Sequence, residues 1–130
     1  MNAAGCIIIC NNSVLLARRI EGKHIPFSGY WSIFAGSREP ESEPPRICAI
    51  RELYEETGIK LKASGLKFAS SIFRGKKILD LFYYKFDSFP EVNLNFEHTE
   101  YGWFNITELK SFPYLIDNKI IDIIQSIDIS

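Results

Sequence analysis

Three glutamates stand close together in the segment 51–59, which reads Arg-Glu-Leu-Tyr-Glu-Glu-Thr-Gly-Ile. If this segment is helical, Glu52, Glu55 and Glu56 share one face, because residues three and four apart in a helix are neighbours. Like charges at that spacing destabilise a helix by about 0.2–0.5 kcal/mol per pair. A bound divalent cation would reverse this penalty, and hard carboxylate oxygens suit Mg²⁺ or Mn²⁺.

A cation held in this way can do chemistry on phosphates. Mg²⁺ usually keeps some waters and shares its coordination shell with substrate phosphates. It can then polarise a phosphoryl oxygen, lower the pKa of a water molecule and neutralise a leaving diphosphate. Glutamates alone do not decide the matter, since charged helix faces are more often only solvated.

The glutamates need a helix to position them, and the sequence predicts one from about Pro45 to Thr57. Ser42 can cap its start, and proline suits the first turn, where its missing N–H has no partner. Gly58 is a natural stop. Helical periodicity predicts an apolar side of the helix, formed by Ile47, Ile50 and Tyr54 with Ala49 and Leu53 beside them.

Strand-like segments surround this helix. The runs 6–10 and 13–18 predict a hairpin around Asn11-Asn12, and 66–73 with 78–86 predict a second one. Shorter strands are expected at 31–34 and 101–104, a helical turn at 106–109, and a closing amphipathic helix from Asp117. This order favours a mixed sheet covered by helices, either α+β or a three-layer sandwich.

The wider string resembles the Nudix box, which is a glycine, five residues, glutamate, seven residues, then Arg-Glu-apolar-x-Glu-Glu-x-Gly-apolar. Glu43 precedes the seven residues before Arg51, and every defined position from Arg51 to Ile59 matches. With its flanks the resemblance covers about Cys6 to Phe104. The family's glycine would fall at Ser37, whereas Gly36 stands one residue early, which implies a one-residue insertion in the loop.

The resemblance implies an α/β fold, a Nudix-like α/β/α sandwich with a mixed β-sheet between helices, formed by residues 1–130 as one hydrolase domain. It implies that Glu52, Glu55 and Glu56 are the metal-binding and catalytic carboxylates. Either Glu55 or Glu56 would be the core ligand, and Glu52 would position or deprotonate water. The loop carbonyl of Gly36 is a further expected ligand.

Two other sets of residues follow from the same resemblance. Glu43 and Arg51 would pair with each other and orient the helix against the loop, a structural role. Family members often use another acidic residue in a later loop as metal ligand or general base. Glu97 and Glu100 both stand at a suitable place before Trp103, so Glu100 joins the catalytic candidates while the choice between the two stays open.

Substrate contacts are expected from a cation and from rings. Arg38 in the box loop would meet phosphates, and Phe27 and Trp31 would stack on a nucleobase. For each ring the alternative is that it fills the core, and for Arg38 it is a solvated surface charge. His24 and His98 have no partner at ligand spacing, so a surface or hydrogen-bonded histidine is expected.

The composition of the chain excludes several classes of protein. With 130 residues and a net charge of −1, the chain has no basic excess for stable binding to nucleic acid. Its three cysteines do not form a disulfide framework or a zinc pattern, and no apolar run is long enough to cross a membrane. We therefore expect a cytoplasmic protein with no membrane association, while a homodimer stays open.

The expected function is a Mg²⁺-dependent pyrophosphohydrolase, with Mn²⁺ as an alternative cofactor. Its partner would be a small-molecule nucleotide, a nucleoside diphosphate linked to another moiety, of the nucleoside triphosphate, dinucleoside polyphosphate or nucleotide-sugar type. The box does not choose among these, because it handles the diphosphate and not the flanking groups. The rival function is a non-catalytic Nudix-like sensor domain that binds a nucleotide without turnover. A purely structural domain would show no metal dependence.

Overall fold

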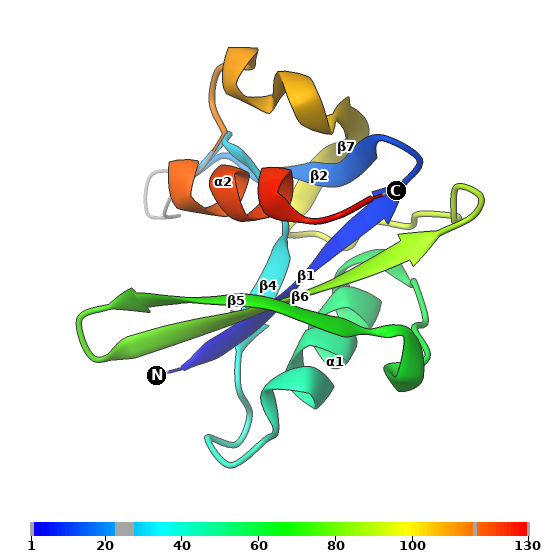
Figure 1. The fold of residues 1–130 in the computed structure, drawn as a ribbon. Coiled ribbons are helices and arrows are strands. Elements are labelled where there is room, and N and C mark those ends of the chain that lie inside the picture. Colours follow the sequence, from blue (N-terminus) through cyan, green and yellow to red (C-terminus); the bar gives the residue numbers. More distant parts are fainter. Residues whose placement is uncertain (1, 23–27, 116, 130) are drawn as a thin grey trace.

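The computed structural model describes residues 2–22, 28–115 and 117–129. Within these residues, seven strands form a single mixed sheet with helices on both sides (Figure 1). The elements in chain order are β1 (Ala3–Cys10), β2 (Ser13–Arg19), β3 (Trp31–Ser32), β4 (Phe34–Ser37), α1 (Pro45–Thr57), the 3₁₀ turn η1 (Ala63–Gly65), β5 (Lys67–Arg74), β6 (Lys77–Phe86), β7 (His98–Asn105), the 3₁₀ helix η2 (Ile106–Ser111) and α2 (Asn118–Ser126).

Strand β1 lies at the centre of the sheet. It pairs with β6 in parallel along its whole length, from Ala3 opposite Leu79 to Cys10 opposite Phe86. Its other edge is shared, because β4 pairs with its first half and β2 with its last residues. A strand covered on both faces favours a continuous apolar run, which is what the segment 6–10 shows.

Two apolar cores lie on opposite faces of the sheet. Cys6 and Ile8 of β1 pack with the buried residues of α1, whereas Ile7 and Ile9 pack with α2 and η2. This alternation follows from the two-residue period of a strand. The expected α/β/α sandwich is therefore confirmed, with α1 on one face and α2 on the other (Figure 1).

Strand β2 holds β7 in place, and β7 completes the site. It pairs with β7 in antiparallel fashion, and the register shifts between Arg18 and Arg19. Arg18 lies opposite Glu100 and Arg19 lies opposite His98, so one extra residue of β7 stands between the two pairs. A bulge of this kind re-aims the side chains beside it.

The ends of α1 agree with the predicted bounds, but its cap does not. The helix begins at Pro45 behind Pro44, without a side-chain cap, so the expected cap by Ser42 is wrong. Proline at the first position leaves one fewer N–H to satisfy. At the other end Gly58 adopts φ 76°, and its N–H donates to the carbonyl of Tyr54. That left-handed conformation favours glycine.

The predicted apolar side of α1 is confirmed for Ala49 and Leu53 and wrong for Ile47 and Tyr54. Cys48, Ala49 and Leu53 are fully buried, whereas Ile47 and Tyr54 are each 49% exposed. The buried side continues to Glu56, which is 3% exposed. The apolar line at Ile47 and Tyr54 was misleading because a carboxylate, and not an apolar residue, occupies the inner end of the helix.

None of the helices in the described residues has both the length and the apolar character that crossing a bilayer requires.

Candidate metal centre and active site

The C-terminal end of α1 is joined to the loop that precedes β7. The N–H of Asn93 donates to the carbonyl of Thr57 at 2.8 Å, and the N–H of Asn95 donates to the carbonyl of Glu56 at 3.1 Å. These carbonyls have no partner inside the helix, so the loop supplies one. The result is that a segment 36 to 39 residues further along the chain lies against the last turn of α1.

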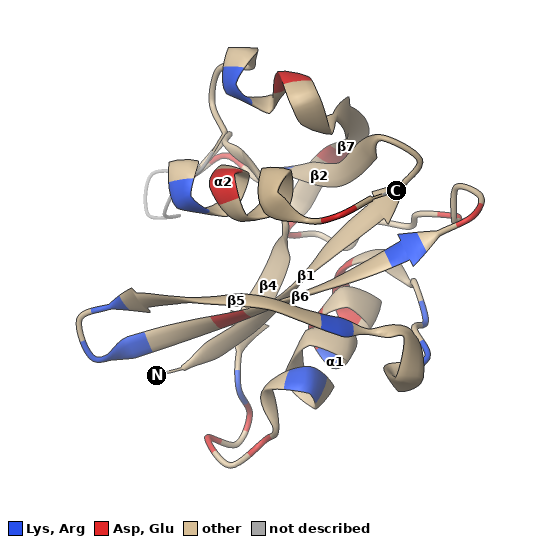
Figure 2. Ribbon diagram, viewed as in Figure 1, with Lys and Arg blue, Asp and Glu red and all other residues tan. Residues whose placement is uncertain are grey.

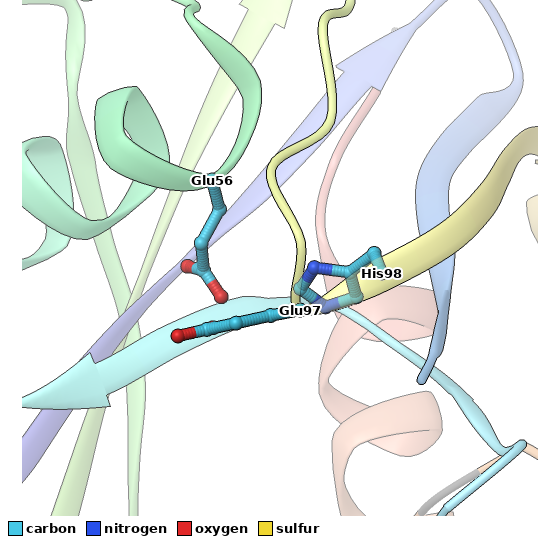
Figure 3. A group of neighbouring side chains, drawn as sticks. All are labelled: Glu56, Glu97 and His98. Carbon is cyan, nitrogen blue, oxygen red and sulfur yellow. The ribbon is translucent and has the colours of Figure 1, made fainter. Parts of the chain in front are cut away.

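The same loop fixes Glu97. Its N–H donates to the side-chain oxygen of Asn95 at 3.0 Å. Its carbonyl accepts a hydrogen bond from the N–H of Ile20 at 2.9 Å, just beyond the end of β2. With its backbone held from two directions, Glu97 projects toward Glu56, and Figure 3 shows the two carboxylates facing each other beside the ring of His98.

Glu56, Glu97 and His98 form the acidic cluster, a name kept below. Each offers one potential ligand atom, and these atoms all lie within 4.8 Å of one another. Glu56 is 3% exposed and His98 is 7% exposed, while Glu97 reaches solvent. Among the described residues, Glu56 Oε2 and His98 Nδ1 are buried atoms without a hydrogen-bond partner.

The electrostatics of Glu56 favour a cation. The pKa of Glu56 is raised to about 9, first by burial and then by the charges of Glu52 and Glu97, against a smaller opposing effect of Arg19. A buried carboxylate with an unused oxygen and two acidic neighbours costs free energy unless something positive joins it. A divalent cation of the kind that carboxylates bind fits this donor set.

Burial also lowers the pKa of His98, and Arg19 contributes to the same effect. Its imidazole is therefore neutral at physiological pH, with an unprotonated ring nitrogen.

Glu52 lies against Gly36 of β4. A Cβ atom at position 36 would stand 2.1 Å from the carboxyl carbon of Glu52, so any other residue there would displace that carboxylate. Burial raises the pKa of Glu52, the nearby guanidinium of Arg51 opposes this, and Glu55 adds to the rise. Gly36 and the Glu52 carboxylate, both named by the sequence, thus lie side by side in spite of the shifted glycine.

Arg51 binds the box loop and two of the box glutamates. Its Nε and Nη2 donate to the two carboxylate oxygens of Glu43 at 2.8 and 2.9 Å, and Nη2 also donates to the carbonyl of Ser37 at 3.1 Å. Its Nη1 lies 3.2 Å from Glu52 and 3.0 Å from Glu55. The hydrogen bond from Arg51 lowers the pKa of Glu43 to about 2, with help from the N–H of Glu39.

The three box glutamates therefore do not converge equally. Glu52 and Glu56 lie on the inner side, close enough for the charge of Glu52 to raise the pKa of Glu56, whereas the side chain of Glu55 is 51% exposed and pairs with Arg51. Cys48 lies one turn before Glu52 on the same helix face, because residues four apart are neighbours, and its thiol donates to the carbonyl of Gly36 at 3.5 Å.

Of Glu97 and Glu100, the two acidic residues considered before Trp103, it is Glu97 that lies close to Glu56. Glu100 lies on β7 opposite Arg18, with 3.8 Å between its carboxylate and the Arg18 guanidinium. It shares a pocket of about 390 Å³ with Arg18 and Trp31. Glu100 is therefore not a member of the acidic cluster.

Arg38 and Trp31, both predicted to contact the substrate, lie in different parts of the structure. Arg38 donates from Nε to the carbonyl of Glu43 at 2.7 Å, within the box loop. Trp31 packs its ring against Phe104, with 5.2 Å between centroids, while also lining the 390 Å³ pocket. Phe27 and His24 lie outside the described residues.

Sequence reasoning missed two polar residues near Glu56. His98, expected as a surface or hydrogen-bonded histidine, is only 7% exposed, its Nδ1 has no hydrogen-bond partner among the described residues, and its ring packs against Phe34 with 5.2 Å between centroids. The Nε of Arg19 is buried without a partner among the described residues. The bulge that turns His98 inward leaves no mark in the sequence, although its position next to Glu97 was a usable signal.

Comparisons with known proteins identify the family of the chain. The profile of the NUDIX domain matches residues 1–124. A search among curated protein sequences finds no match.

Solved structures with the same fold are numerous. A Caenorhabditis elegans Ap4A hydrolase binary complex has a TM-score of 0.74 and 20% identity, over 95% of this chain and 92% of that one. The NUDIX domain of Shewanella oneidensis NrtR, complexed with ADP ribose, has a TM-score of 0.75 and 14% identity, over 95% and 84%.

A third structure contains a metal ion. It is a bifunctional NMN adenylyltransferase/ADP ribose pyrophosphatase from Francisella tularensis complexed with AMP and a Mn ion, with a TM-score of 0.71 and 24% identity. The match covers 94% of this chain, which spans only 39% of the length of the Francisella protein. At these identities the likeness establishes the fold.

Proposed function

The chain belongs to the NUDIX family of hydrolases, which act on phosphoanhydride bonds, and we propose that it cleaves a nucleoside diphosphate linked to another moiety in a reaction that needs Mg²⁺ or Mn²⁺. The substrate class includes nucleoside triphosphates, dinucleoside polyphosphates and ADP-ribose or other nucleotide-sugar compounds.

One observation carries the proposal. Glu56 is 3% exposed, its Oε2 has no partner among the described residues, and Glu97 faces it. A chain that used Glu56 only for structure would have paired that oxygen with a donor, because an unpaired buried polar group costs about 1–3 kcal/mol. A metal site explains why the arrangement is kept, since active sites retain such costs for function.

The roles of the residues follow from their positions. Glu56 and Glu97 would hold the metal ion, with Glu55 reaching it from the exposed side and the Gly36 carbonyl from β4. When bound, the ion would polarise a phosphoryl oxygen and stabilise the leaving phosphate. Glu52, half-buried beside Gly36, would accept the proton of the attacking water. The water oxygen bonds to phosphorus as the bridging P–O bond breaks, which leaves two phosphate-bearing products.

A cleft beside Gly36 suits the rest of the substrate. It has a volume of about 280 Å³ and is lined by Gly36, Ser37, Ile72, Leu79 and the cations Arg74 and Lys77, among others. Figure 2 shows these basic residues gathered at the turn between β5 and β6. Gly36 lines the cleft and also lies against the Glu52 carboxylate, so a nucleotide in the cleft would need to extend its diphosphate past β4 toward the α1 side of the sheet to meet the metal.

A substrate panel tests the proposal. Nucleoside triphosphates, dinucleoside polyphosphates, ADP-ribose and nucleotide sugars are incubated with the protein and Mg²⁺ or Mn²⁺, and the products are separated by chromatography. The wild type should convert at least one class. Glu56→Gln should lose about 10²–10³-fold in rate, the size found when one group that stabilises transition-state charge is removed.

The matched control is Glu108→Gln, an exposed glutamate of η2 that should keep wild-type rates. Equal turnover by wild type and Glu56→Gln would exclude the assigned site. Lys77→Ala should raise KM with little change in kcat if the cleft holds the substrate. A rise in KM for Trp31→Ala and not for Lys77→Ala would instead place the substrate in the 390 Å³ pocket.

The second candidate is a nucleotide sensor, and the bound ADP ribose in the NrtR domain favours keeping it. A sensor would bind ADP ribose, which calorimetry measures. It would leave the compound chemically unchanged after hours of incubation with either Mg²⁺ or Mn²⁺. Turnover of any compound in the panel that depends on Glu56 would exclude this candidate.

A further inference from the structure

His98 has a position in the site that the Nudix box does not require. It is the first residue of β7, immediately after Glu97, and one of its ring nitrogens lies within 4.8 Å of carboxylate oxygens of Glu56 and Glu97. We propose that His98 is a nitrogen ligand of the metal ion held by Glu56 and Glu97, and that this makes the site prefer Mn²⁺ and other first-row transition ions over Mg²⁺. The inference rests on the proposed function, because it assigns a ligand at the same metal site.

The backbone supports this orientation. In a regular strand His98 and Glu100 would point to the same face, because side chains alternate. The bulge at the β2–β7 pair breaks the alternation, so Arg19 pairs with His98 while Arg18 pairs with Glu100. As a result His98 is 7% exposed, whereas Glu100 faces solvent. Bulges next to active sites often serve to re-aim a side chain in this way.

The His98 ring is held in place by packing, but one of its nitrogen atoms lacks a hydrogen-bond partner. Its edge packs against Phe34, with 5.2 Å between centroids and 68° between planes. Nδ1 has no hydrogen-bond partner among the described residues. A histidine kept only for packing would be replaced at no loss by an apolar residue, since a buried polar atom without a partner is costly. A cation between the ring and the two carboxylates satisfies the ring and Glu56 Oε2 together.

The chemistry of the ligand sets the metal preference. Carboxylates, carbonyls and water suit Mg²⁺ and Mn²⁺ about equally, but imidazole nitrogen is a ligand of transition ions. Mg²⁺ demands a near-ideal shell of oxygens and gives up water reluctantly. An imidazole nitrogen added to the oxygen ligands of this site therefore favours Mn²⁺, and in the usual order of affinities Co²⁺ above it.

Pulsed electron paramagnetic resonance of bound Mn²⁺ tests the ligand directly. Mn²⁺ alone is added to the full chain, and the electron spin echo envelope is examined for modulation by a coupled ¹⁴N nucleus. The wild type should show this modulation, and it should change to the ¹⁵N pattern when only the histidines carry ¹⁵N. Such labelling needs no substitution, so the result does not depend on how a variant folds.

The second histidine provides a matched control. The chain contains His24 and His98 only, so His24→Gln should keep the nitrogen signal and His98→Gln should lose it. His98→Gln should also weaken Mn²⁺ binding by about 10- to 100-fold, the range found when groups that support a metal site are removed. Its affinity for Mg²⁺ should change less.

The outcomes separate this inference from the proposed function. Bound Mn²⁺ without any histidine nitrogen coupling, or a signal that disappears in His24→Gln, would overturn the role of His98 and leave the hydrolase proposal intact. Equal losses of Mn²⁺ and Mg²⁺ affinity in His98→Gln would overturn the metal preference. Failure of the wild type to bind Mn²⁺ at all would overturn both.

Discussion

Arg51 donates two hydrogen bonds to Glu43, from Nε at 2.8 Å and from Nη2 at 2.9 Å, so that a planar guanidinium meets both oxygens of one carboxylate. The same Nη2 donates to the carbonyl of Ser37. Through these contacts the start of the box loop, its last residue and the middle of α1 are held together. The pair therefore fixes where Glu52 lies relative to Gly36.

Replacing Arg51 with lysine should impair activity more than a change of surface charge would. Lysine keeps the charge but lacks the planar fork that binds two oxygens at once. We expect a fall in kcat of up to about 100-fold, because a shift of about 1 Å in a catalytic group can cost that much. Steady-state kinetics measure it. Arg46→Lys on the same helix, where a cation still reaches the carbonyl of Leu66, should stay close to wild type.

Glu56→Gln should stabilise the metal-free protein while it removes activity. The wild-type carboxyl, whose pKa is raised to about 9, must take up a proton when the chain folds at pH 8, whereas the amide of glutamine needs none. At pH 8 in chelator, the free energy of unfolding should rise by roughly 1–3 kcal/mol, the cost of one unsatisfied buried group. Urea denaturation gives the value. A variant that is less stable than wild type under these conditions would mean that Glu56 already has a structural partner.

The stability of the metal-free protein should fall as the pH rises. Glu56 has a pKa of about 9 in the folded chain against 4.5 in its ordinary state, so the folded state binds the proton more tightly. The contribution is full below pH 4.5 and is lost progressively as the pH rises toward 9, with a slope of at most about 1.4 kcal/mol per pH unit for one group.

Unfolding in urea with chelator at pH 6 and at pH 8.5 measures this dependence. Glu56→Gln should flatten it, and saturating Mn²⁺ should reverse it, because the ion binds the deprotonated carboxylate and stabilises only the folded state. A wild type whose stability rises from pH 6 to pH 8.5 in chelator would contradict the assignment of the raised pKa to Glu56.

Gly36→Ala should disturb Glu52 selectively. The added methyl group would stand 2.1 Å from the Glu52 carboxyl carbon, so the carboxylate must move. We expect a loss of kcat of about 10- to 100-fold, with Mn²⁺ affinity affected less, since Glu56 and Glu97 are untouched. The neighbouring Ser37→Ala keeps the backbone carbonyl that Arg51 binds and should be nearly silent. Comparable losses in both variants would show that the loop as a whole, and not the Glu52 contact, is sensitive.

Much of the frame was predictable from the sequence. Pro45 and Gly58 bound the helix because their backbone preferences are local, and the two hairpins followed from apolar runs around turn residues. The spacing of the Nudix box located Glu52 and Glu56 because a local motif encodes a helix face.

The features that could not be predicted from the sequence depend on tertiary contacts. Whether Glu97 or Glu100 joins Glu56 depends on hydrogen bonds from Asn93 and Asn95 to the end of α1 and on a bulge opposite Arg19. The inward position of His98 depends on the same bulge. The exposure of Ile47 and Tyr54 shows the converse limit, since periodicity identifies a helix but does not reveal which side meets the sheet.

Anomalous diffraction from crystals soaked in Mn²⁺ is the most direct test of the claim that Glu56 and Glu97 hold the catalytic ion. The account predicts a Mn²⁺ peak at coordination distance from Glu56 Oε2 and a Glu97 oxygen, absent from Glu56→Gln crystals treated in the same way. A wild-type crystal with no peak beside Glu56, or with Mn²⁺ bound only at the surface pair of Arg18 and Glu100, would contradict it.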